Sequence, residues 1–302
     1  MSERVCAVVV TYNRKELLRE CLEALRGQTR KVDHILVVDN ASTDGTEEVL
    51  RAEFPEVEVL RLPENQGSSG GFHEGMKRAY EEGFDWLWLM DDDTIPRQEA
   101  LEELLLGAER AEGVLGRKPD FLSSRALWTD GRPHPMNLQS LRKDPPDLLF
   151  ALLEVGLAPI RGASFVSLLV YGGAVAEYGY PRKEFFVWND DVEYTHRITR
   201  KGVGVLAPKS IAVHKSKSAY TPYQLKGKDV ERYFFEVRNK IWLIKSEVLL
   251  PKEKVWHWLS LLYRTTQFLR SNLINPRAYG SVLRGTLDGL FGYWSKSRGF
   301  ED

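Results

Sequence analysis

The stretch that decides the fold spans residues 86–96 and reads Trp-Leu-Trp-Leu-Met-Asp-Asp-Asp-Thr-Ile-Pro. Five large apolar residues lead straight into Asp91, Asp92 and Asp93. A short, uninterrupted apolar run is typical of a strand that is buried on both faces of a parallel sheet. The three acids then lie at the carboxyl end of that strand, where open α/β sheets bind their ligands. The stretch therefore predicts an α/β fold with a carboxylate cluster at one edge of its sheet.

Three adjacent carboxylates are costly to ionise, because each repels the others unless a cation lies among them. Oxygen ligands favour Mg²⁺ or Mn²⁺, and such an ion is normally shared with a substrate phosphate. An acidic triplet can also be a solvated turn that caps the following helix. The apolar strand before the acids and Pro96 behind them favour a divalent-metal site here.

Strand patterns alternate with helix patterns in the chain before these acids. Apolar runs predict strands at Arg4–Val10, His34–Val38, Val57–Leu62 and Asp85–Met90. Helical spacing predicts helices at Lys15–Leu25, Thr46–Phe54 and Gly71–Glu82, the last of which follows a Gly/Ser-rich loop. This alternation with short connections predicts a doubly wound, mostly parallel sheet.

The pattern becomes less regular beyond Asp93. The predicted elements are a helix at Arg97–Glu112, a strand at Phe121–Leu127, an irregular loop at Thr129–Pro146, a β-rich stretch at Arg161–Tyr171, helices at Gly172–Tyr178 and Asp191–Lys201, and strands at Val203–Leu206 and Ile211–His214. From Asp229 onward only helices are predicted, at Asp229–Leu249, Lys252–Asn272 and Pro276–Lys296. We therefore divide the chain into an α/β domain of residues 1–225 and a C-terminal helical region of residues 226–302.

The composition is that of a globular protein rather than a nucleic-acid binder. The 302 residues are 43% hydrophobic and 28% charged, and the formal net charge is −1. Cys6 and Cys21 have no metal-ligand spacing, so we interpret them as core thiols of a reduced, cytoplasmic protein. We expect no signal peptide, and no apolar run reaches the length of about eighteen residues that a spanning helix needs.

The C-terminal region has a different charge balance from the rest. From Lys226 onward there are 14 Lys and Arg residues against 8 Asp and Glu residues, whereas 28 basic and 35 acidic residues precede it. Its helices mix these charges with aromatic residues, namely Trp242, Trp256, Trp258, Tyr263, Phe268, Phe291 and Trp294. Such a mixture occurs at a lipid interface, in a helix core, or between protomers of a homo-oligomer. Aromatic stripes at helical spacing are more often core, so we keep all three alternatives, including peripheral contact at the inner face of the membrane.

Each predicted strand of the first part ends in polar residues that face one crevice. Individually these are often turn or cap residues, but a sheet with polar groups at every carboxyl end is typical of a ligand-binding sheet. Asp39 is suited to accept from the N–H of a base, and Arg14 to pair with a phosphate. In the Asn65–Phe72 segment, glycines permit close approach of backbone N–H groups to a phosphate, although the segment matches neither nucleotide-binding fingerprint.

Two later features complete the candidate site. Trp188-Asn189-Asp190-Asp191-Val192-Glu193-Tyr194 precedes a predicted helix. The acids either cap that helix or serve as a general base that the helix N-terminus keeps ionised. His214 ends a short predicted strand, where it is either structural or a ligand that completes a carboxylate site for Mn²⁺ or Mg²⁺.

With these features in order, the chain resembles the family-2 glycosyltransferases of the GT-A fold. The resemblance is carried by residues 8–14 and 37–46, by Asn65–Phe72, by the three acids, and by residues 188–194. It is similar to the branch of bacterial galactofuranosyl- and rhamnosyltransferases, in which a glycine pair before Phe72 and a downstream histidine are usual. Processive synthases of the family carry membrane spans and a Gln-x-x-Arg-Trp motif, neither of which this sequence has, so we expect one or a few sugars to be added.

The resemblance implies an inverting transfer from a nucleoside-diphosphate sugar, UDP- or dTDP-linked, to a glycan or lipid-linked acceptor. By analogy, Asp91, Asp93 and His214 bind the divalent metal, and Asp191 is the base, with Asp190 as the fallback. The analogy assigns the nucleotide-sugar site to Thr11, Tyr12, Arg14, Asp39, Asn65, Gly70, Gly71, Asp91, Asp92 and Trp188. Two alternatives stay open: a sugar-phosphate nucleotidyltransferase, for which residues 11–14 lack the glycines that hold a triphosphate, and a non-catalytic nucleotide-sugar-binding module.

Overall fold

The computed structural model describes residues 3–216 and 222–292, which fall into two units. The first unit comprises residues 1–186 and 190–219, and the second comprises residues 187–189 and 220–302. The second unit thus begins a few residues before the predicted division after residue 225, and it includes a short piece of chain that precedes Asp190.

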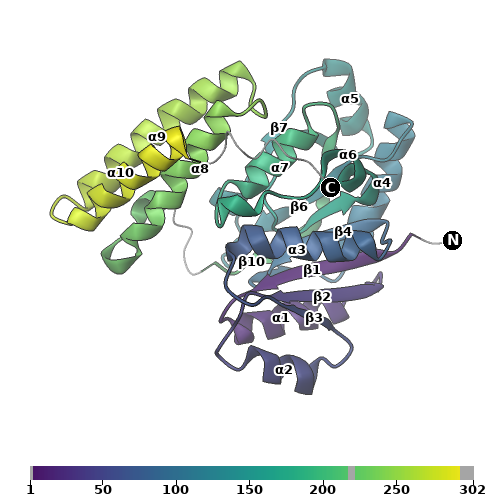
Figure 1. The fold of residues 1–302 in the computed structure, drawn as a ribbon. Helices are drawn as coiled ribbons and strands as arrows, with labels where there is room; N and C mark the ends of the chain where they lie inside the picture. Colours follow the sequence, from purple (N-terminus) through teal and green to yellow (C-terminus); the bar gives the residue numbers. More distant parts are fainter. Residues whose placement is uncertain (1–2, 217–221, 293–302) are drawn as a thin grey trace. The chain divides into compact units, whose positions relative to one another are not determined.

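One mixed sheet forms the centre of the first unit (Figure 1). Its strand order is β3-β2-β1-β4-β9-β6-β10-β8-β7, with β5 paired to β10. The strands are β1 Val5–Thr11, β2 His34–Asp39, β3 Glu58–Arg61, β4 Trp86–Asp91, β5 Thr94–Pro96, β6 Phe121–Leu127, β7 Ser140–Leu141, β8 Ala158–Gly162, β9 Leu168–Tyr171 and β10 Gly204–His214. β1 to β4 pair in parallel, as do β6 and β10, whereas β9 runs antiparallel between β4 and β6. The predicted α/β class with a mostly parallel sheet is confirmed.

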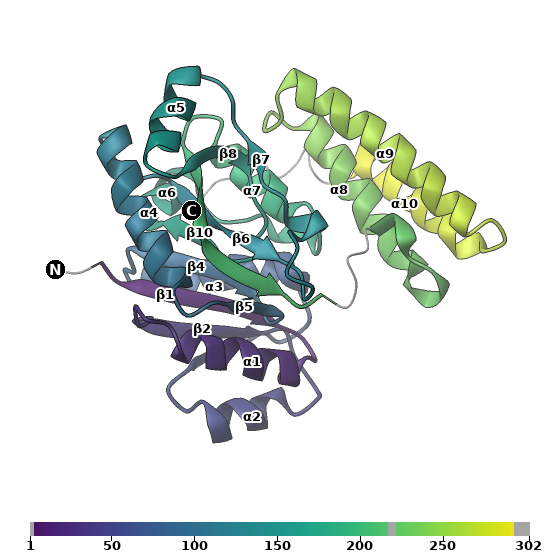
Figure 2. The same cartoon turned by 180° about the vertical axis from the view of Figure 1, so that it is seen from behind.

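Helices cover both faces of this sheet. They are α1 Lys15–Arg26, α2 Thr46–Glu53, α3 Gly67–Glu81, α4 Ala100–Leu115, α5 Pro146–Glu154, α6 Gly172–Tyr178 and α7 Asp190–Ile198, with 3₁₀ turns η1 Pro135–Asn137 and η2 Lys183–Phe185. Successive β1 side chains point to opposite faces. Val5, Ala7 and Val9 pack in the core that holds residues of α1, α2 and α4, on the face seen in Figure 2. Cys6 and Val8 pack on the other face, in the core with α3.

The glycine-rich segment before Phe72 is helical, so the predicted Gly/Ser-rich loop is wrong at this point. α3 begins at Gly67, four residues earlier than predicted. A Cβ atom at Gly71 would lie 2.5 Å from Val10 Cγ1, and one at Gly75 would lie 2.5 Å from Val8 Cγ1. These two glycines let α3 approach the sheet closely, and for Gly71 this packing accounts for the residue type without a ligand.

Beyond Asp93 the structure contains elements that the sequence pattern does not predict. The predicted loop at Thr129–Pro146 contains η1 and β7, and α5 begins at its last residue. The β-rich stretch at Arg161–Tyr171 belongs to two strands, β8 and β9, which are not neighbours in the sheet. The two strands predicted at Val203–Leu206 and Ile211–His214 are one long strand, β10, with an irregular register between Ala207 and Ile211.

The second unit consists of α8 Tyr233–Lys245, α9 Pro251–Ser271 and α10 Pro276–Phe291, preceded by the 3₁₀ turns η3 Pro222–Gln224 and η4 Gly227–Arg232. α10 packs closely on α8, because Gly285 and Gly289 face it: a Cβ atom at Gly285 would lie 2.7 Å from the Phe234 carbonyl oxygen. Trp294 and the predicted helical residues 293–296 lie outside the described residues. Among the helices of the described residues, none combines the length and hydropathy that crossing a bilayer requires.

Candidate active site at the carboxyl ends of the strands

The three acids lie where β4 ends beside β1. Asp91 is the last residue of β4 and pairs in register with Val10. Thr11 Oγ1 donates to Asp92 Oδ2 over 2.8 Å. Arg14 Nη1 donates to both Asp92 Oδ1, at 3.2 Å, and Asp93 Oδ2, at 2.9 Å. The structure thus brings together Thr11, Arg14 and the acids, as the sequence predicted.

The acids differ in their electrostatic environment. Burial, reinforced by the charges of Asp93 and Asp92, raises the pKa of Asp91 well above its usual range. Burial also raises the pKa of Asp92 to about 6, against the opposing charge of Arg14. For Asp93 the hydrogen bond and charge of His214, together with Arg14, outweigh burial and lower the pKa. Ionising all three carboxyl groups would therefore bury more negative charge than Arg14 alone balances, which is the condition that a divalent cation relieves.

His214 reaches the acids from β10, a strand that is separated from β4 by β9 and β6 in the sheet. It is the last residue of β10, and β5 pairs it with Thr94, next to the acids. Its Nε2 lies 3.1 Å from Asp93 Oδ1, and its Nδ1 lies 2.8 Å from Asn137 Oδ1. Asn137 donates through Nδ2 to Ser164 Oγ at 2.9 Å, so its oxygen faces the imidazole. Nδ1 therefore donates to Asn137, and this hydrogen bond holds the ring with Nε2 on the side of Asp93, as second-shell partners do for metal-binding histidines.

The donor set fits a hard divalent cation, although the structure assembles only part of it. Asp93 and His214 supply an oxygen and a nitrogen at one place, whereas Asp91 does not join them in a compact group of three ligands. Within the described residues, the group of three whose ligand atoms all lie within 4.8 Å of one another is His34, Glu58 and Glu82. The predicted Asp91 ligand therefore stays a prediction.

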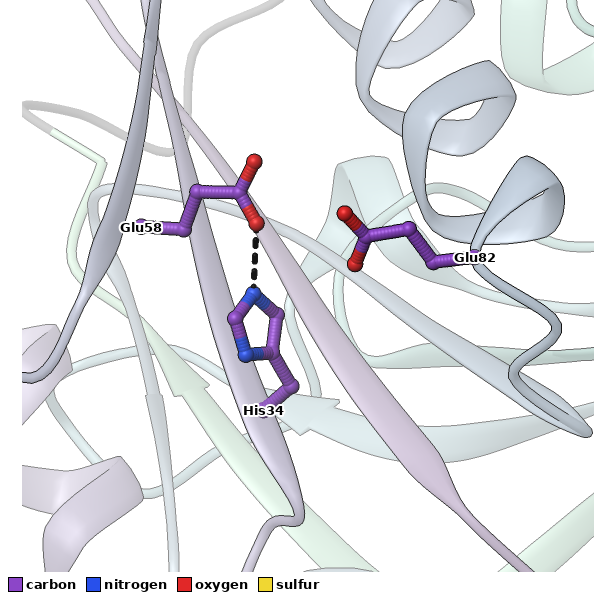
Figure 3. A group of neighbouring side chains, drawn as sticks. All are labelled: His34, Glu58 and Glu82. Atoms are coloured by element: carbon purple, nitrogen blue, oxygen red, sulfur yellow. Dashed lines mark hydrogen bonds and ion pairs between the residues drawn. The ribbon is translucent and has the colours of Figure 1, made fainter.

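The His34 cluster lies at the amino ends of the strands, opposite to the acids of β4, and Figure 3 shows its three side chains together. His34 begins β2 and Glu58 begins β3, while Glu82 follows the end of α3. Glu58 accepts from His34 Nε2 at 2.7 Å and from Arg78 Nε at 2.8 Å, and Arg78 Nη2 lies 2.6 Å from Glu82. One guanidinium, that of Arg78, bridges both carboxylates, so we interpret the cluster as an ion-pair network that fixes α3 to the sheet.

Asp39 at the end of β2 has an oxygen available for a ligand. Oδ1 accepts from the backbone N–H of Ser42 at 2.9 Å. Oδ2 is buried without a hydrogen-bond partner among the described residues, and Arg61 Nη1 lies 3.7 Å from it. A buried carboxylate oxygen without a donor is unfavourable unless a ligand supplies one. The predicted contact of Asp39 with a base N–H stays a prediction.

The other predicted residues of this edge have varied environments. Asn65 Oδ1 accepts from the Gly67 N–H at 2.8 Å, which places Asn65 at the start of α3 as a capping side chain. Tyr12 is 43% exposed. A Cβ atom at Gly70 would lie 2.4 Å from Gln66 Cβ, so local packing restricts that position too. Ligand contacts for Asn65, Tyr12 and Gly70 stay predictions.

The second pair of acids opens α7. Asp190 is buried, and burial raises its pKa to about 6 while the neighbouring Ser69 side chain opposes the shift. Asp190 adds to the charges that raise the pKa of Asp91, so the two acidic groups share one electrostatic environment. Asp191 is partly exposed, and its Oδ1 accepts from the Val192 N–H at 2.7 Å.

The chain leading to Asp190 is held by the first turn of α3, a relationship that sequence reasoning missed. Ser69 N donates to the Phe186 carbonyl at 3.2 Å. A Cβ atom at Gly67 would lie 1.9 Å from the same oxygen, and Gly67 has a φ of +72°. Phe186 itself has a φ of 64°, which is uncommon outside glycine. The glycine at residue 67 is the sequence feature that could have indicated a close backbone contact. That the contact is with Phe186 depends on the tertiary fold.

Trp188 belongs to the second unit. Its carbonyl accepts from Asn239 Nδ2 at 2.9 Å, and the Arg232 guanidinium lies 5.2 Å from its ring centroid. These contacts give Trp188 a packing role within that unit, and its predicted contact with the nucleotide sugar stays a prediction.

Comparisons with known proteins agree on one family. The family model described as Glycosyl transferase family 2 matches residues 6–155. Galactofuranosyltransferase GlfT1 of Mycolicibacterium smegmatis is 30% identical over an alignment of 279 residues that covers 85% of this chain and 90% of that protein. The N-acetylglucosaminyl-diphospho-decaprenol L-rhamnosyltransferase of Mycobacterium tuberculosis is 25% identical over an alignment of 235 residues that covers 71% of this chain and 76% of that protein.

Two solved structures with the same fold contain nucleotide ligands. Residues 1–349 of S. aureus TarS with UDP-GlcNAc superpose with a TM-score of 0.61 at 16% identity, covering 92% of this chain and 79% of that one. GalNAc-T7 with UDP, GalNAc and Mn²⁺ superposes with a TM-score of 0.55 at 11% identity, covering 82% and 52%. At these identities the likeness concerns the fold, which here is the GT-A fold.

Proposed function

The chain belongs to glycosyltransferase family 2, and from that premise we propose that it transfers a sugar, with inversion, from a UDP- or dTDP-linked donor. The observations that carry the proposal are the cluster of buried carboxyl groups at the end of β4 and the Asp39 oxygen at the end of β2, which has no hydrogen-bond donor among the described residues. A nucleoside diphosphate in complex with a divalent cation matches both, since the base N–H suits Asp39 and the cation suits the acids. Thr11 and Arg14 would orient the acids around it.

Asp93 and His214 would hold the metal, with Asp91 as the third ligand, and either Mn²⁺ or Mg²⁺ suits these oxygen and nitrogen donors. When bound, the cation supplies charge that stabilises the departing diphosphate. Asn137 fixes the imidazole so that Nε2 faces the metal position. Arg14, held by Asp92 and Asp93, adds a positive charge on the same side of the acids.

Asp191 would be the general base, with Asp190 as the fallback. The acceptor hydroxyl attacks the anomeric carbon, its proton passes to the carboxylate, and the bond between that carbon and the diphosphate oxygen breaks. The position of Asp191 in the first turn of α7 favours its ionised form. Its carboxylate is also more accessible to an acceptor than that of Asp190, which is buried.

The donor sugar and the acceptor follow from the relatives only as proposals. GlfT1 is named as a galactofuranosyltransferase and the second relative as an L-rhamnosyltransferase acting on a diphospho-decaprenol glycan. We therefore favour UDP-galactofuranose or dTDP-rhamnose as donor and a cell-surface glycan or lipid-linked glycan as acceptor, reached from the cytoplasmic side. The runner-up, a sugar-phosphate nucleotidyltransferase, would release pyrophosphate from a nucleoside triphosphate and a sugar phosphate.

The direct test is a screen of UDP- and dTDP-sugars for release of the nucleoside diphosphate, with and without Mn²⁺ or Mg²⁺. We expect metal-dependent hydrolysis of one donor in the absence of acceptor. Asp191→Asn should bind UDP or dTDP as the wild type does and lose transfer by a factor of about 10² to 10⁴. Calorimetric silence with UDP and dTDP in every metal combination would instead favour a non-catalytic module, and near-normal transfer by Asp191→Asn would reject that residue as the base.

A further inference from the structure

The helix α9 exposes its large apolar residues instead of burying them. The side facing α8 carries His257, Leu261, Phe268 and Asn272, all of which are buried. The opposite side carries residues that are between 42% and 67% exposed, namely Val255, Trp256, Trp258, Leu259, Leu262, Tyr263 and, just past its end, Leu273. A helix on the surface of a globular protein normally has its apolar residues on the inner side and its polar residues outside.

The helix α10 shows the same inversion. Its side against α8 consists of small residues, Ala278, Ser281, Gly285 and Gly289, each of which is buried. The other side carries Tyr279, Leu283, Leu287, Leu290 and Phe291, the last of which is 80% exposed. Helices that pack in lipid have small residues between them and large apolar residues on their outer sides. We call the exposed apolar residues of α9 and α10, with Leu273 and Ile274 between the helices, the outward face.

Basic residues border the outward face. Lys252 lies in the first turn of α9 and Arg270 in its last turn, both on the side of Leu259, and both are exposed. Arg277 and Arg284 of α10 are exposed as well. The two acids of these helices have other tasks: Glu253 accepts from the backbone N–H of Leu250, and Asp288 lies 3.8 Å from Arg238. The face is thus apolar with a positive border.

We propose that the outward face docks on the surface of an anionic lipid bilayer, with its Trp and Leu side chains in the interface and its Lys and Arg side chains on lipid phosphates. This composition is that of helices that lie in the plane of a membrane interface. An apolar face of this extent is also far larger than isolated exposed residues require. The proposal is independent of the transfer chemistry, because vesicle binding needs no sugar nucleotide.

A second copy of the chain is the other conceivable occupant, and the charges disfavour it. The face has Lys252 near one end of α9 and Arg270 and Arg277 near the other. Two copies that pair through this face place basic residues against basic residues in either orientation, because both ends carry the same sign. Like charges across an interface weaken association. An anionic lipid surface meets the same residues with opposite charge.

The experiment is flotation of the full chain with vesicles of phosphatidylglycerol and phosphatidylcholine in equal amounts, against vesicles of phosphatidylcholine alone. We expect binding to the anionic vesicles that weakens at high salt. The triple variant Trp256→Ala/Leu259→Ala/Leu262→Ala, and separately Lys252→Glu/Arg270→Glu/Arg277→Glu, should each lower the vesicle affinity by about tenfold or more. The matched control is Leu106→Ala/Phe150→Ala/Leu153→Ala, three exposed apolar residues of the first unit, which should bind as the wild type does.

The proposal is overturned if the wild type binds neither vesicle, or if the control loses as much affinity as the α9 variant. Light scattering on the same samples covers the alternative occupant. A wild-type dimer that Trp256→Ala/Leu259→Ala/Leu262→Ala converts to a monomer, without vesicle binding by either, assigns the face to self-association instead. Circular dichroism of the variants checks that they fold, and donor hydrolysis checks that the first unit is intact, so loss of binding and loss of chemistry are separate readouts.

Discussion

His214 Nε2 lies 3.1 Å from Asp93 Oδ1, and Asn137 holds the opposite nitrogen of the same imidazole at 2.8 Å. The three residues come from different segments: Asp93 follows β4, His214 ends β10, and Asn137 ends the η1 turn. An imidazole held in this way presents one tautomer to a metal ion, which raises its quality as a ligand. Asn137 is thus a positioning residue in the proposed metal site.

The first prediction concerns this positioning. Asn137→Ala should weaken Mn²⁺ binding in the presence of UDP by about ten- to a hundredfold, because the imidazole loses the partner that fixes its tautomer. Calorimetric titration of Mn²⁺ measures the change. His34→Ala is the control, since it removes the histidine of the other cluster without touching this one. If His34→Ala weakens Mn²⁺ binding and Asn137→Ala does not, the metal site has been placed at the wrong end of the sheet.

The second prediction concerns the contact between Gly67 and Phe186. A methyl group at residue 67 meets the Phe186 carbonyl oxygen at 1.9 Å, so Gly67→Ala must displace the chain that leads to Asp190. We expect the rate of transfer to fall much more than the affinity for UDP, because the acids at β4 stay in place. Steady-state kinetics and UDP calorimetry on the same variant separate the two effects.

Gly83 provides a matched control for this variant. Its φ of +74° resembles the +72° of Gly67, yet nothing lies within 4 Å of a Cβ atom at Gly83. Gly83→Ala therefore incurs the left-handed backbone cost of about 1–2 kcal/mol without the steric clash. If both variants have the same kinetic profile, the contact with Phe186 does not position Asp190.

The fold was predictable from sequence where it depends on local periodicity. The strands and helices before Asp93 follow from uninterrupted apolar runs and from the spacing of residues such as Leu18 and Leu22. The structure confirms them, except that α3 begins earlier than predicted. Beyond Asp93 the strand order depends on pairings between distant segments. β9 enters antiparallel between β4 and β6, and β8 pairs with β10, neither of which a local pattern encodes.

The candidate site shows the same division. Asp39, the β4 acids and Asp190 could be named because each follows or precedes an element with a clear pattern. Asn137 could not, since it lies in a stretch predicted to be an irregular loop and reaches His214 only through the tertiary fold. Glycine at residue 71 was interpreted as permitting close approach to a phosphate; the structure shows that it also permits the approach of α3 to Val10, and its contact with the nucleotide sugar stays a prediction.

The third prediction concerns the stability cost of Asp190. Burial raises its pKa from the ordinary 3.8 to about 6, so the folded state holds a proton that the unfolded state has lost between these values. Above pH 6 the charged carboxylate is buried at a cost to the folded state of up to about 3 kcal/mol. Asp190→Asn should therefore increase the free energy of unfolding at pH 7 to 8, and the gain should vanish as the pH falls toward 4.

Denaturant unfolding of the metal-free protein across this pH range measures the gain. Asp130→Asn, a change at a more exposed carboxylate of the first unit, should leave the free energy of unfolding unchanged within about 0.5 kcal/mol. A loss of stability in Asp190→Asn at pH 8 would mean that the charged form of Asp190 is well satisfied in the fold.

The last prediction concerns Glu236, the centre of a buried ion-pair group in the second unit. It lies 3.2 Å from Lys240 and 3.1 Å from Arg264, and both Glu236 and Lys240 are only 3% exposed. Glu236→Gln leaves Lys240 buried without its counter-charge, which should cost about 3–5 kcal/mol of the free energy of unfolding.

The pH dependence of this stabilisation follows from the pKa of Glu236. Although burial raises that pKa, the attraction of Lys240 and Arg264 outweighs burial and lowers it below the ordinary 4.5. The stabilisation by the wild-type carboxylate is therefore present above pH 4.5 and is lost as the pH falls through the lowered value, so wild type and variant should converge in acid. Denaturant unfolding at pH 7 and at acid pH measures the difference in the free energy of unfolding between wild type and variant, with Glu247→Gln, a change at an exposed residue, as the control. A difference that persists at acid pH would show that packing of the Glu236 side chain, and not its charge, stabilises α8.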